Sequence, residues 1–278
     1  MSLGVLIRRY KWFHKPISLF FQYIVYPLGN GYYLFMLKYI FIIKRNEIVE
    51  LQKYGFTKII PFNSRTWRIG KERDKAYRRY YSAYFKDKKC FIKVAQNDST
   101  IGNEITVAEQ LLGKKLDYIS EVITFDKKFA SNMQMLATAF TDGLHPISKE
   151  SIYNDVEQVS SSQLIRYCKQ MYKILLSLED LQLVHADIHK GNLMLDSNDN
   201  LILLDFGISK FLDKENEVKY DCRPGTFFRQ TPEGRVYDDA YSFLQLINRY
   251  ESCRNIHDTE AYKSICARVN KVKFLVII

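Results

Sequence analysis

Two short apolar runs open the chain, and an alternating, strand-like pattern follows them. The runs cover residues 17–26 (I-S-L-F-F-Q-Y-I-V-Y) and 32–43 (Y-Y-L-F-M-L-K-Y-I-F-I-I). A helix that crosses a bilayer needs about 20 apolar residues, so each run is too short, and Pro27 and Gly29 separate the two. We therefore expect residues 1–50 to form a basic, apolar helical extension.

Basic residues flank both apolar runs. They are Arg8, Arg9, Lys11 and Lys15 before the first run and Lys44 and Arg45 after the second. Apolar, aromatic helices with basic ends suit the headgroup region of an anionic membrane, so one interpretation is peripheral attachment to a membrane surface. The alternative is a helical hairpin packed against the main domain. A secretory signal is disfavoured, because no small-residue cleavage site of the usual kind is present.

The pattern up to residue 140 predicts a sheet accompanied by one helix. The expected strands are residues 66–70, 76–85, 90–94 and 133–140, and the expected helix is residues 103–113. Charged turns separate the first three strands, and T-D-G follows the last. We assign residues 51–140 to one lobe on this basis.

Residues 141–278 form a second, helical lobe in this interpretation. Ser160 and Gln163 match an S-x-x-Q capping box, and apolar residues then recur at helical spacing. Two short strands, 193–195 and 201–204, and a helix over 237–250 are expected after it. A strand-rich half followed by a helical half predicts an α+β fold with two lobes and a cleft between them.

Composition narrows the choice of partner only in part. The 278 residues are 47% hydrophobic and 26% charged, which is an ordinary globular balance, and the net charge is +10. Such an excess favours anionic partners such as nucleotide phosphates, acidic lipid or glycan. The motifs of common RNA modules and zinc fingers are absent, so no nucleic-acid partner is expected. Five widely spaced cysteines without C-x-x-C predict reduced thiols in the cytoplasm.

One segment carries a chemical signature. Residues 184–207 read V-H-A-D-I-H-K-G-N-L-M-L-D-S-N-D-N-L-I-L-L-D-F-G, in which Asn192 follows Asp187 by five residues and Asp205 closes a predicted hairpin. The segment resembles the catalytic loop H-x-D-x-x-x-x-N and the D-F-G motif of the protein-kinase-like superfamily. The resemblance extends over roughly residues 60–250 and implies a bilobal kinase-like fold with an antiparallel-sheet N-lobe and a helical C-lobe.

The resemblance implies a role for each of these residues. Asp187 would orient an acceptor hydroxyl and accept its proton, while Asn192 and Asp205 would hold magnesium. Carboxylate and amide oxygens are hard ligands, which Mg²⁺ prefers. His185 is expected to brace the loop rather than to take part in chemistry. ATP and Mg²⁺ are therefore the expected cofactors.

The resemblance also implies a nucleotide site in the first lobe. Lys93 in F-I-K-V matches the strand lysine that meets the phosphates of ATP, and its helix partner is Glu104 or Glu109. We favour Glu104, because N-E-x-x-x-A-x-x-x-L resembles the family helix. Ala137 and Ala139, in the strand before T-D-G, are also expected to bind the nucleotide.

The phosphate-binding loop departs from the family pattern. No G-x-G-x-x-G precedes Lys93, and Gly70, which we include among the nucleotide-binding residues, is the only glycine at the expected turn. Lys71, Arg73 or Lys75 would then hold the phosphates in place of bare backbone amides.

Two later motifs resemble protein kinases. Residues 225–233 (G-T-F-F-R-Q-T-P-E) are similar to the end of an activation segment, and residues 239–243 (D-A-Y-S-F) to the start of the following helix. In the family, the first residue of that helix braces the catalytic loop, so we expect Asp239 to do so here.

The acceptor is the open question. The loop H-x-D-x-H-x-G-N, with His189 in place of lysine, looks like small-molecule and lipopolysaccharide-sugar kinases, and Ala186 replaces the arginine that pairs with a phosphorylated activation segment. The first hypothesis is therefore a kinase of a lipid-linked sugar, such as lipopolysaccharide core, at the inner face of the membrane. The second is a Ser/Thr protein kinase, and the third is a pseudokinase scaffold.

Overall fold

A computed structural model describes most of the chain from residue 47 onward. The described residues are 47–61, 77–96, 98–130, 132–147, 159–212, 217–219, 227–232, 234–271 and 273–277. The chain divides into two compact units, residues 1–56 and 57–278. None of the helices in the described ranges has the length and apolar character needed to cross a bilayer.

The first unit is described only in its last part. Residues 47–54 form a helix, in which Leu51 is fully buried. The rest of the expected N-terminal extension lies outside the described residues. So do the expected strand at 66–70 and the basic residues proposed to hold phosphates.

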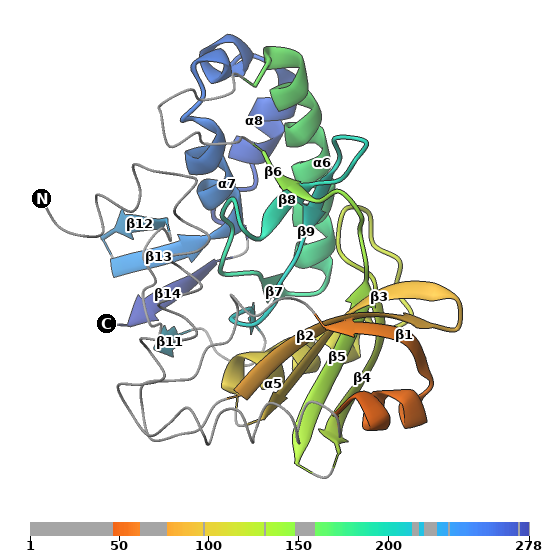
Figure 1. Cartoon of the computed structure of the whole chain (residues 1–278). Helices are drawn as coiled ribbons and strands as arrows, with labels where there is room; N and C mark the ends of the chain where they lie inside the picture. Colours follow the sequence, from red (N-terminus) through yellow and green to blue (C-terminus); the bar gives the residue numbers. More distant parts are fainter. Residues whose placement is uncertain are drawn as a thin grey trace, which may run out of the picture. The chain divides into compact units, whose positions relative to one another are not determined.

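The N-lobe is a five-stranded sheet (Figure 1). Its strands, in spatial order, are β1 (Phe56–Pro61), β2 (Tyr77–Phe85), β3 (Lys88–Gln96), β5 (Met133–Ala139) and β4 (Val122–Phe129). The pairs β2–β3, β3–β5 and β4–β5 are antiparallel. The sequence did not indicate β4, because register shifts interrupt its pairing with β5 and its residues show no clean alternation.

One helix, α5 (Ser99–Leu111), packs against β4 and β5. It begins four residues before the expected start at residue 103. Asp98 causes this early start, since its side chain accepts hydrogen bonds from the backbone N–H of Thr100 and Ile101 and caps the helix. The first turn contains threonine, isoleucine and glycine, whose low helix propensity concealed it in the sequence.

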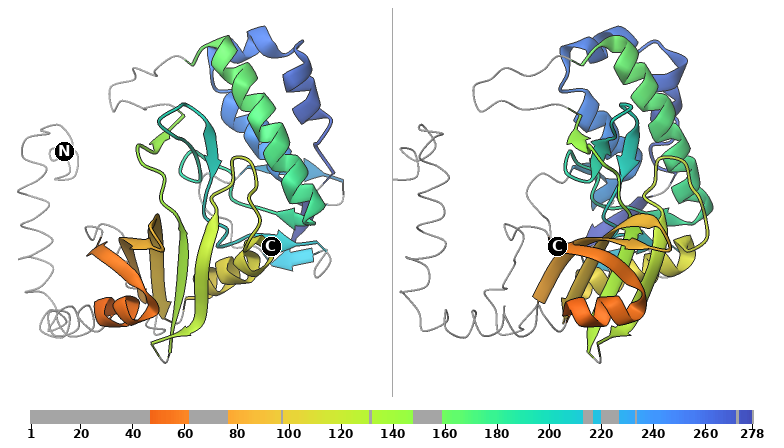
Figure 2. Two further views of the ribbon diagram at one scale, coloured as in Figure 1. Left: turned by 90° about the vertical axis from the view of Figure 1, so that its right-hand side faces the viewer. Right: turned by 45° about the vertical axis from the view of Figure 1, so that its right-hand side comes forward.

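The C-lobe is built on α6 (Ser161–Asp180), and the predicted capping box is present at its start. The Ser160 side chain accepts a hydrogen bond from Gln163 N, and the Gln163 side chain accepts one from Ser160 N. Three further helical elements accompany α6: α7 (Asp239–Ile247), η2 (Glu251–Ile256) and α8 (Glu260–Cys266). Both α7 and α8 pack against α6 (Figure 2). The expected helix 237–250 is shorter than predicted, because Asp238 caps it.

Short strands connect the C-lobe to the cleft. The predicted hairpin is formed by β8 (Leu193–Leu195) and β9 (Leu201–Leu203), and β6 (His145–Pro146) extends it. A separate pair joins β7 (Leu183–Val184) to β10 (Lys210–Phe211). These pairs lie immediately before and after the H-A-D and D-F-G segments, so they fix both segments in the same part of the lobe.

A four-stranded sheet in the C-lobe was not expected from the sequence. Its order is β11 (Glu217–Lys219), β14 (Lys273–Ile277), β13 (Gly234–Asp238) and β12 (Phe228–Thr231). Only β12–β13 is a local hairpin; β14 comes from far along the chain and pairs with β13 and β11. Local patterns do not reveal such distant pairing.

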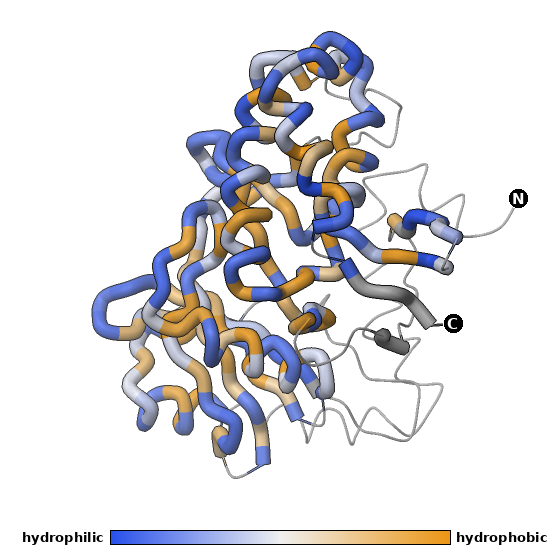
Figure 3. Tube along the Cα trace, turned by 180° about the vertical axis from the view of Figure 1, so that it is seen from behind, coloured by the Kyte–Doolittle hydropathy of each residue, from blue (hydrophilic) through white to orange (hydrophobic). Residues whose placement is uncertain are grey.

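Hydrophobic residues from both lobes form one core cluster, with Ile105 of α5, Leu164 of α6, Leu203 of β9 and Phe243 of α7 almost fully buried. Figure 3 shows the alternation of hydrophobic and hydrophilic positions along the strands and helices that enclose this core. The sheet with α5 and the helical C-lobe confirm the α+β, two-lobed architecture. The proposed lobe boundary at residues 140 and 141 stays a prediction.

Candidate active site

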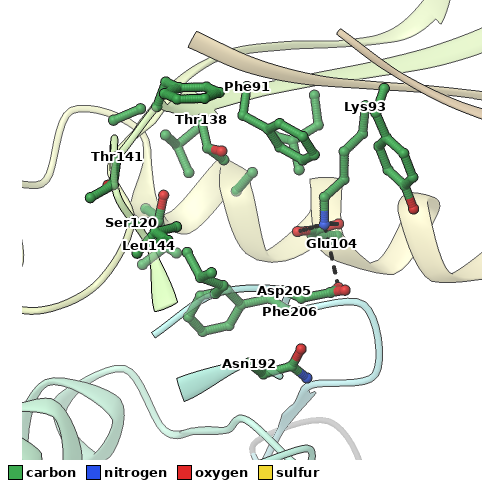
Figure 4. A pocket seen from close by; sticks show the side chains of 18 of the residues that line it. Phe91, Lys93, Glu104, Ser120, Thr138, Thr141, Leu144, Asn192, Asp205 and Phe206 are labelled. Carbon is green, nitrogen blue, oxygen red and sulfur yellow. Dashed lines mark hydrogen bonds and ion pairs between the residues drawn. The ribbon is translucent and has the colours of Figure 1, made fainter. Parts of the chain in front are cut away.

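A cavity of about 630 Å³ lies where the two lobes meet in the second unit. Residues of β3, α5 and β5 line it from the N-lobe, and residues of the loop after β5, the catalytic loop and the D-F-G segment line it from the C-lobe (Figure 4). Its walls include apolar side chains together with Lys93, Glu104, Asn192 and Asp205, whereas Asp187 is not among the lining residues.

Lys93 and Glu104 form an ion pair inside this cavity. Lys93 Nζ lies 2.7 and 2.8 Å from the two carboxylate oxygens of Glu104 and 3.4 Å from Asp205 Oδ1. The two residues are only 8% and 4% exposed. Burial favours a neutral lysine, but the Glu104 and Asp205 carboxylates outweigh it and raise the Lys93 pKa, so the ammonium stays charged.

Glu109, the alternative partner, lies elsewhere. Its carboxylate forms an exposed ion pair with Lys127, at 2.7 Å. Five residues along a helix correspond to about 140° of rotation, so Glu104 and Glu109 face different directions. Only Glu104 of these two glutamates is turned toward Lys93.

Asp187 and Asn192 are joined directly within the catalytic loop. The Asn192 side-chain amide donates to the backbone carbonyl of Asp187 at 3.1 Å and to its Oδ2 at 3.0 Å. Because Nδ2 makes both bonds, Asn192 presents its side-chain oxygen as an acceptor. Asn192 and Asp205 both line the cavity (Figure 4).

Asp205 presents a partly exposed carboxylate to the cavity. Its φ of +63° places it in the left-handed region, and its side chain is 44% exposed. Burial opposes its ionisation, but the positive charges of Lys93 and Arg78 outweigh this and lower the Asp205 pKa. The oxygen atoms of Asp205 and Asn192 are hard ligands and would suit Mg²⁺, which would supply positive charge beside a phosphate group. Among the described residues, no cluster of three or more histidine, cysteine or acidic side chains forms a metal cage.

His185 links the catalytic loop to the D-F-G segment. Its Nε2 donates to the backbone carbonyl of Leu204 (2.9 Å), and its Nδ1 accepts from Asp187 N (3.3 Å). The ring also contacts Phe206 edge-on, with 4.9 Å between ring centroids. Burial lowers the pKa of His185 to about 4, so the imidazole is neutral at pH 7. His185 thus braces the loop, as the sequence predicts.

Asp239, the first residue of α7, binds the backbone of the catalytic loop. Its carboxylate accepts hydrogen bonds from His185 N (2.7 Å) and Ala186 N (3.1 Å). Ala186 has a φ of +66°, which costs free energy for a residue with a side chain, and the two hydrogen bonds compensate for that strain. The sequence-based expectation for Asp239 is confirmed.

His189 lies beside the catalytic aspartate candidate. Its Nδ1 accepts a hydrogen bond from Gly191 N (2.9 Å), and its Nε2 is 3.5 Å from Asp187 Oδ1. A side chain at position 191 would put a Cβ only 2.8 Å from His189 Cε1, so it would displace the His189 ring. Both histidines of H-x-D-x-H thus approach Asp187: His185 accepts a hydrogen bond from its backbone N–H, and His189 lies beside its carboxylate.

Aromatic side chains form a part of the pocket that the sequence analysis missed. Tyr80 of β2 and Phe91 of β3 line the cavity and stack with their centroids 5.5 Å apart. Phe91 stands two residues before Lys93, so both point to the same face of the strand, and this spacing was the available signal. Ala139 also lines the cavity, whereas Ala137 is fully buried and does not; Gly70 lies outside the described residues.

Comparisons with known proteins agree with this geometry. Residues 105–222 match the family model of the ABC1 atypical kinase-like domain. Two probable serine/threonine-protein kinases of Dictyostelium discoideum are each 28% identical, over 38% and 46% of the chain. A probable serine/threonine-protein kinase of Encephalitozoon cuniculi, a KIN1 homolog, is 32% identical over 24% of the chain.

The chain spans only 7%, 27% and 12% of the length of these three relatives. The matches therefore concern a kinase-like portion and not whole proteins. With the two-lobed fold and the Lys93–Glu104 pair facing Asp205, these similarities support a divergent member of the protein-kinase-like superfamily.

Proposed function

We propose that this protein is a kinase that transfers the γ-phosphate of ATP to a hydroxyl group with the help of Mg²⁺. The observation that carries this proposal is the arrangement of Lys93, Asn192 and Asp205 around a single cavity, with Asp187 hydrogen-bonded to Asn192. A positive charge, two hard oxygen groups and a carboxylate base are the components that phosphoryl transfer requires.

Each residue has a defined role in this proposal. Lys93, charged and fixed by Glu104, binds the phosphates. Asn192 and Asp205 hold Mg²⁺, which neutralises the charge on the transferred group. Asp187 orients the acceptor hydroxyl and takes its proton, while neutral His185 keeps the loop in place.

The cavity suits a nucleotide in size and lining. About 630 Å³ is within the range of sites that enclose small ligands. The face of Phe91 offers a stacking surface for a base, and Lys93 stands at the phosphate end (Figure 4). The basic residues Lys71, Arg73 and Lys75, which lie outside the described ranges, remain our proposed substitutes for a glycine-rich loop.

For the acceptor, we favour a lipid-linked sugar such as lipopolysaccharide core. His189 and the basic, apolar residues 1–50 support this choice, and they also support a cytoplasmic protein attached to the inner face of a membrane. A Ser/Thr protein kinase is the second candidate, favoured by the names of the relatives and by residues 225–233. The intact Lys93–Glu104 pair argues against a pseudokinase scaffold.

Substitution of Asp187 tests the catalytic role. We expect Asp187→Asn to reduce transfer from labelled ATP by at least a hundredfold while ATP affinity stays within about threefold, because Asp187 acts on the acceptor. Asp117→Asn serves as the control, since this exposed aspartate only pairs with Lys173. Undiminished turnover in the Asp187 variant would disprove the role.

The destination of the label identifies the acceptor. A lipid or glycan extract and a protein fraction from the same cells are incubated with the protein and labelled ATP. Label in the extract supports the sugar kinase, and label in protein supports the protein kinase. Absence of label from both, with ATP still bound, supports the scaffold.

A further inference from the structure

Asn103 connects α5 to the D-F-G segment. Its side-chain amide donates toward three backbone carbonyls, those of Phe206 (3.2 Å), Gly207 (3.2 Å) and Ser209 (2.9 Å). These carbonyls belong to the turn that directly follows Asp205. The half-buried amide of one residue therefore fixes a turn that lies more than 100 residues away in the sequence.

A close contact strengthens the same junction. A Cβ on Gly207 would lie 3.3 Å from Thr100 Cβ and 3.5 Å from the Thr100 carbonyl oxygen. The turn after Asp205 is thus packed against the first turn of α5 with little free space. Thr100 is held in turn by Asp98, to whose Oδ1 its hydroxyl donates at 2.7 Å.

The first turn of α5 is also attached to the sheet. Arg78 of β2 donates from Nε and Nη2 to the two oxygens of Asp98, at 2.8 and 2.9 Å. The two side chains are only 16% and 11% exposed, so the pair is shielded from water. The start of α5 is therefore fixed to β2 on one side and to the D-F-G turn on the other.

The position of Asn103 in the sequence connects this junction with the residues of the candidate site. Asn103 immediately precedes Glu104, which orients Lys93, and the carbonyls that it binds immediately follow Asp205. Movement of the D-F-G turn away from α5 would break the hydrogen bonds of Asn103 and would separate Asp205 from Lys93. Ala186 replaces the arginine that would pair with a phosphorylated segment, so the chain relies on other contacts to hold this arrangement.

We propose that Asn103 is a positioning residue that keeps Asp205 beside the Lys93–Glu104 pair in the arrangement that binds a magnesium nucleotide. This inference rests on the proposed function, since it assumes that Asp205 binds Mg²⁺. Asn103 touches neither nucleotide nor metal and acts through the backbone of the D-F-G turn.

The test compares two isosteric substitutions on the same helix. Asn103→Asp replaces the amide donor by a carboxylate that repels the three carbonyls. Gln110→Glu makes the same amide-to-carboxylate change at an exposed position of α5 and serves as the control. ATP affinity is measured by calorimetry for the full chain, once with excess Mg²⁺ and once with a chelator.

We expect Mg²⁺ to increase the ATP affinity of the wild type and of Gln110→Glu equally. In Asn103→Asp this increase should fall by at least tenfold, while the affinity for metal-free ATP stays within about threefold. A general loss of fold would lower both affinities together, so the ratio separates positioning from simple destabilisation. An unchanged ratio in Asn103→Asp would overturn the inference and leave the proposed function intact. A wild type that binds no nucleotide would overturn the proposed function and this inference with it.

A second variant covers the case in which Asn103→Asp does not fold. Asn103→Ala removes the donor without adding charge, and hydrogen exchange is then followed at the backbone amides of residues 205–209 in the absence of nucleotide. Faster exchange than in the wild type supports the inference, because the turn opens more often without its anchor. Exchange at the wild-type rate contradicts it.

Discussion

At the scale of single residues, the cleft concentrates polar groups that burial would normally exclude. Lys93, Glu104, His185, Asp187 and Asn192 are each at most 8% exposed. Every one of them has a hydrogen-bond or ion-pair partner. Removal of a single partner from such a buried set leaves a desolvated group behind, which costs about 3–5 kcal/mol for a charge. The site is therefore specified by pairs of residues rather than by individual ones.

His185 makes the stability of the fold depend on pH. Burial lowers its pKa from the ordinary value of 6.5 to about 4 in the folded protein. Below pH 6.5 the His185 side chain of the unfolded protein binds a proton that the folded protein does not bind. The free energy of unfolding therefore has its full value, as far as His185 is concerned, above pH 6.5, and it decreases as the pH falls toward 4. The loss over this window amounts to about 3 kcal/mol.

The contribution is measured as a difference between variants. Asp239, whose pKa burial raises to about 7, acts in the opposite direction: it stabilises the fold increasingly as the pH falls from 7 toward 4. Asp239 is present in both the wild type and His185→Gln, so the difference between them reports on His185. We expect the destabilisation caused by His185→Gln to be largest near pH 7 and to be smaller by about 3 kcal/mol at pH 4. Chemical unfolding at several pH values measures it, with the exposed His257→Gln as the control. A difference that does not vary with pH would refute this account.

At the scale of elements, the start of α5 is held by contacts with more than one part of the protein. Asp98 caps the helix and also neutralises Arg78. Substitution of Asp98 therefore removes two interactions that act on the same turn, and it leaves a largely buried guanidinium without its carboxylate. A cap alone is worth about 1 kcal/mol, whereas a broken buried ion pair costs more.

The double role of Asp98, as helix cap and as ion-pair partner, predicts a graded effect on stability. Asp98→Ala should lower the free energy of unfolding by about 3 kcal/mol, because a cap and an ion pair are lost. Ser160→Ala, which removes only the cap of α6, should lower it by about 1 kcal/mol. Denaturant unfolding of both variants checks the order. Equal losses would mean that the Arg78–Asp98 pair contributes nothing beyond the cap.

At the scale of the whole molecule, the N-terminal segment carries the prediction of membrane attachment. Replacement of Arg8, Arg9, Lys11 and Lys15 by glutamine in the full chain should weaken binding to vesicles with anionic lipid at least tenfold, since each basic residue contributes about 1 kcal/mol at such a surface. ATP binding should not change, because Lys93 and Asp205 belong to the second unit. Vesicle co-sedimentation at fixed salt measures the first effect.

A matched variant separates this segment from total charge. Glutamine replaces four exposed lysines of the second unit, namely Lys86, Lys114, Lys115 and Lys128, which changes the net charge by the same amount. We expect this variant to bind vesicles like the wild type. If both variants lose binding equally, the overall charge of +10 is responsible and the N-terminal segment is not.

The sequence by itself determined the parts of this protein that depend on neighbours along the chain. The cap of α6, the hairpin between β8 and β9, and the spacing from Asp187 to Asp205 follow from turn residues and from hydrophobic periodicity. The pattern of strands and helices predicted the two lobes, and the resemblance of residues 184–207 to a kinase catalytic loop implied which residues form the site.

Only the tertiary structure decided which distant groups meet. It paired Lys93 with Glu104, stacked Tyr80 on Phe91, and brought Asn103 to the D-F-G turn. It also paired β14 with β13 in a sheet that the local sequence pattern did not predict. The physical reason is that such contacts depend on the packing of whole elements, which sets direction and distance in space, whereas the sequence encodes directly only the preferences of neighbouring residues.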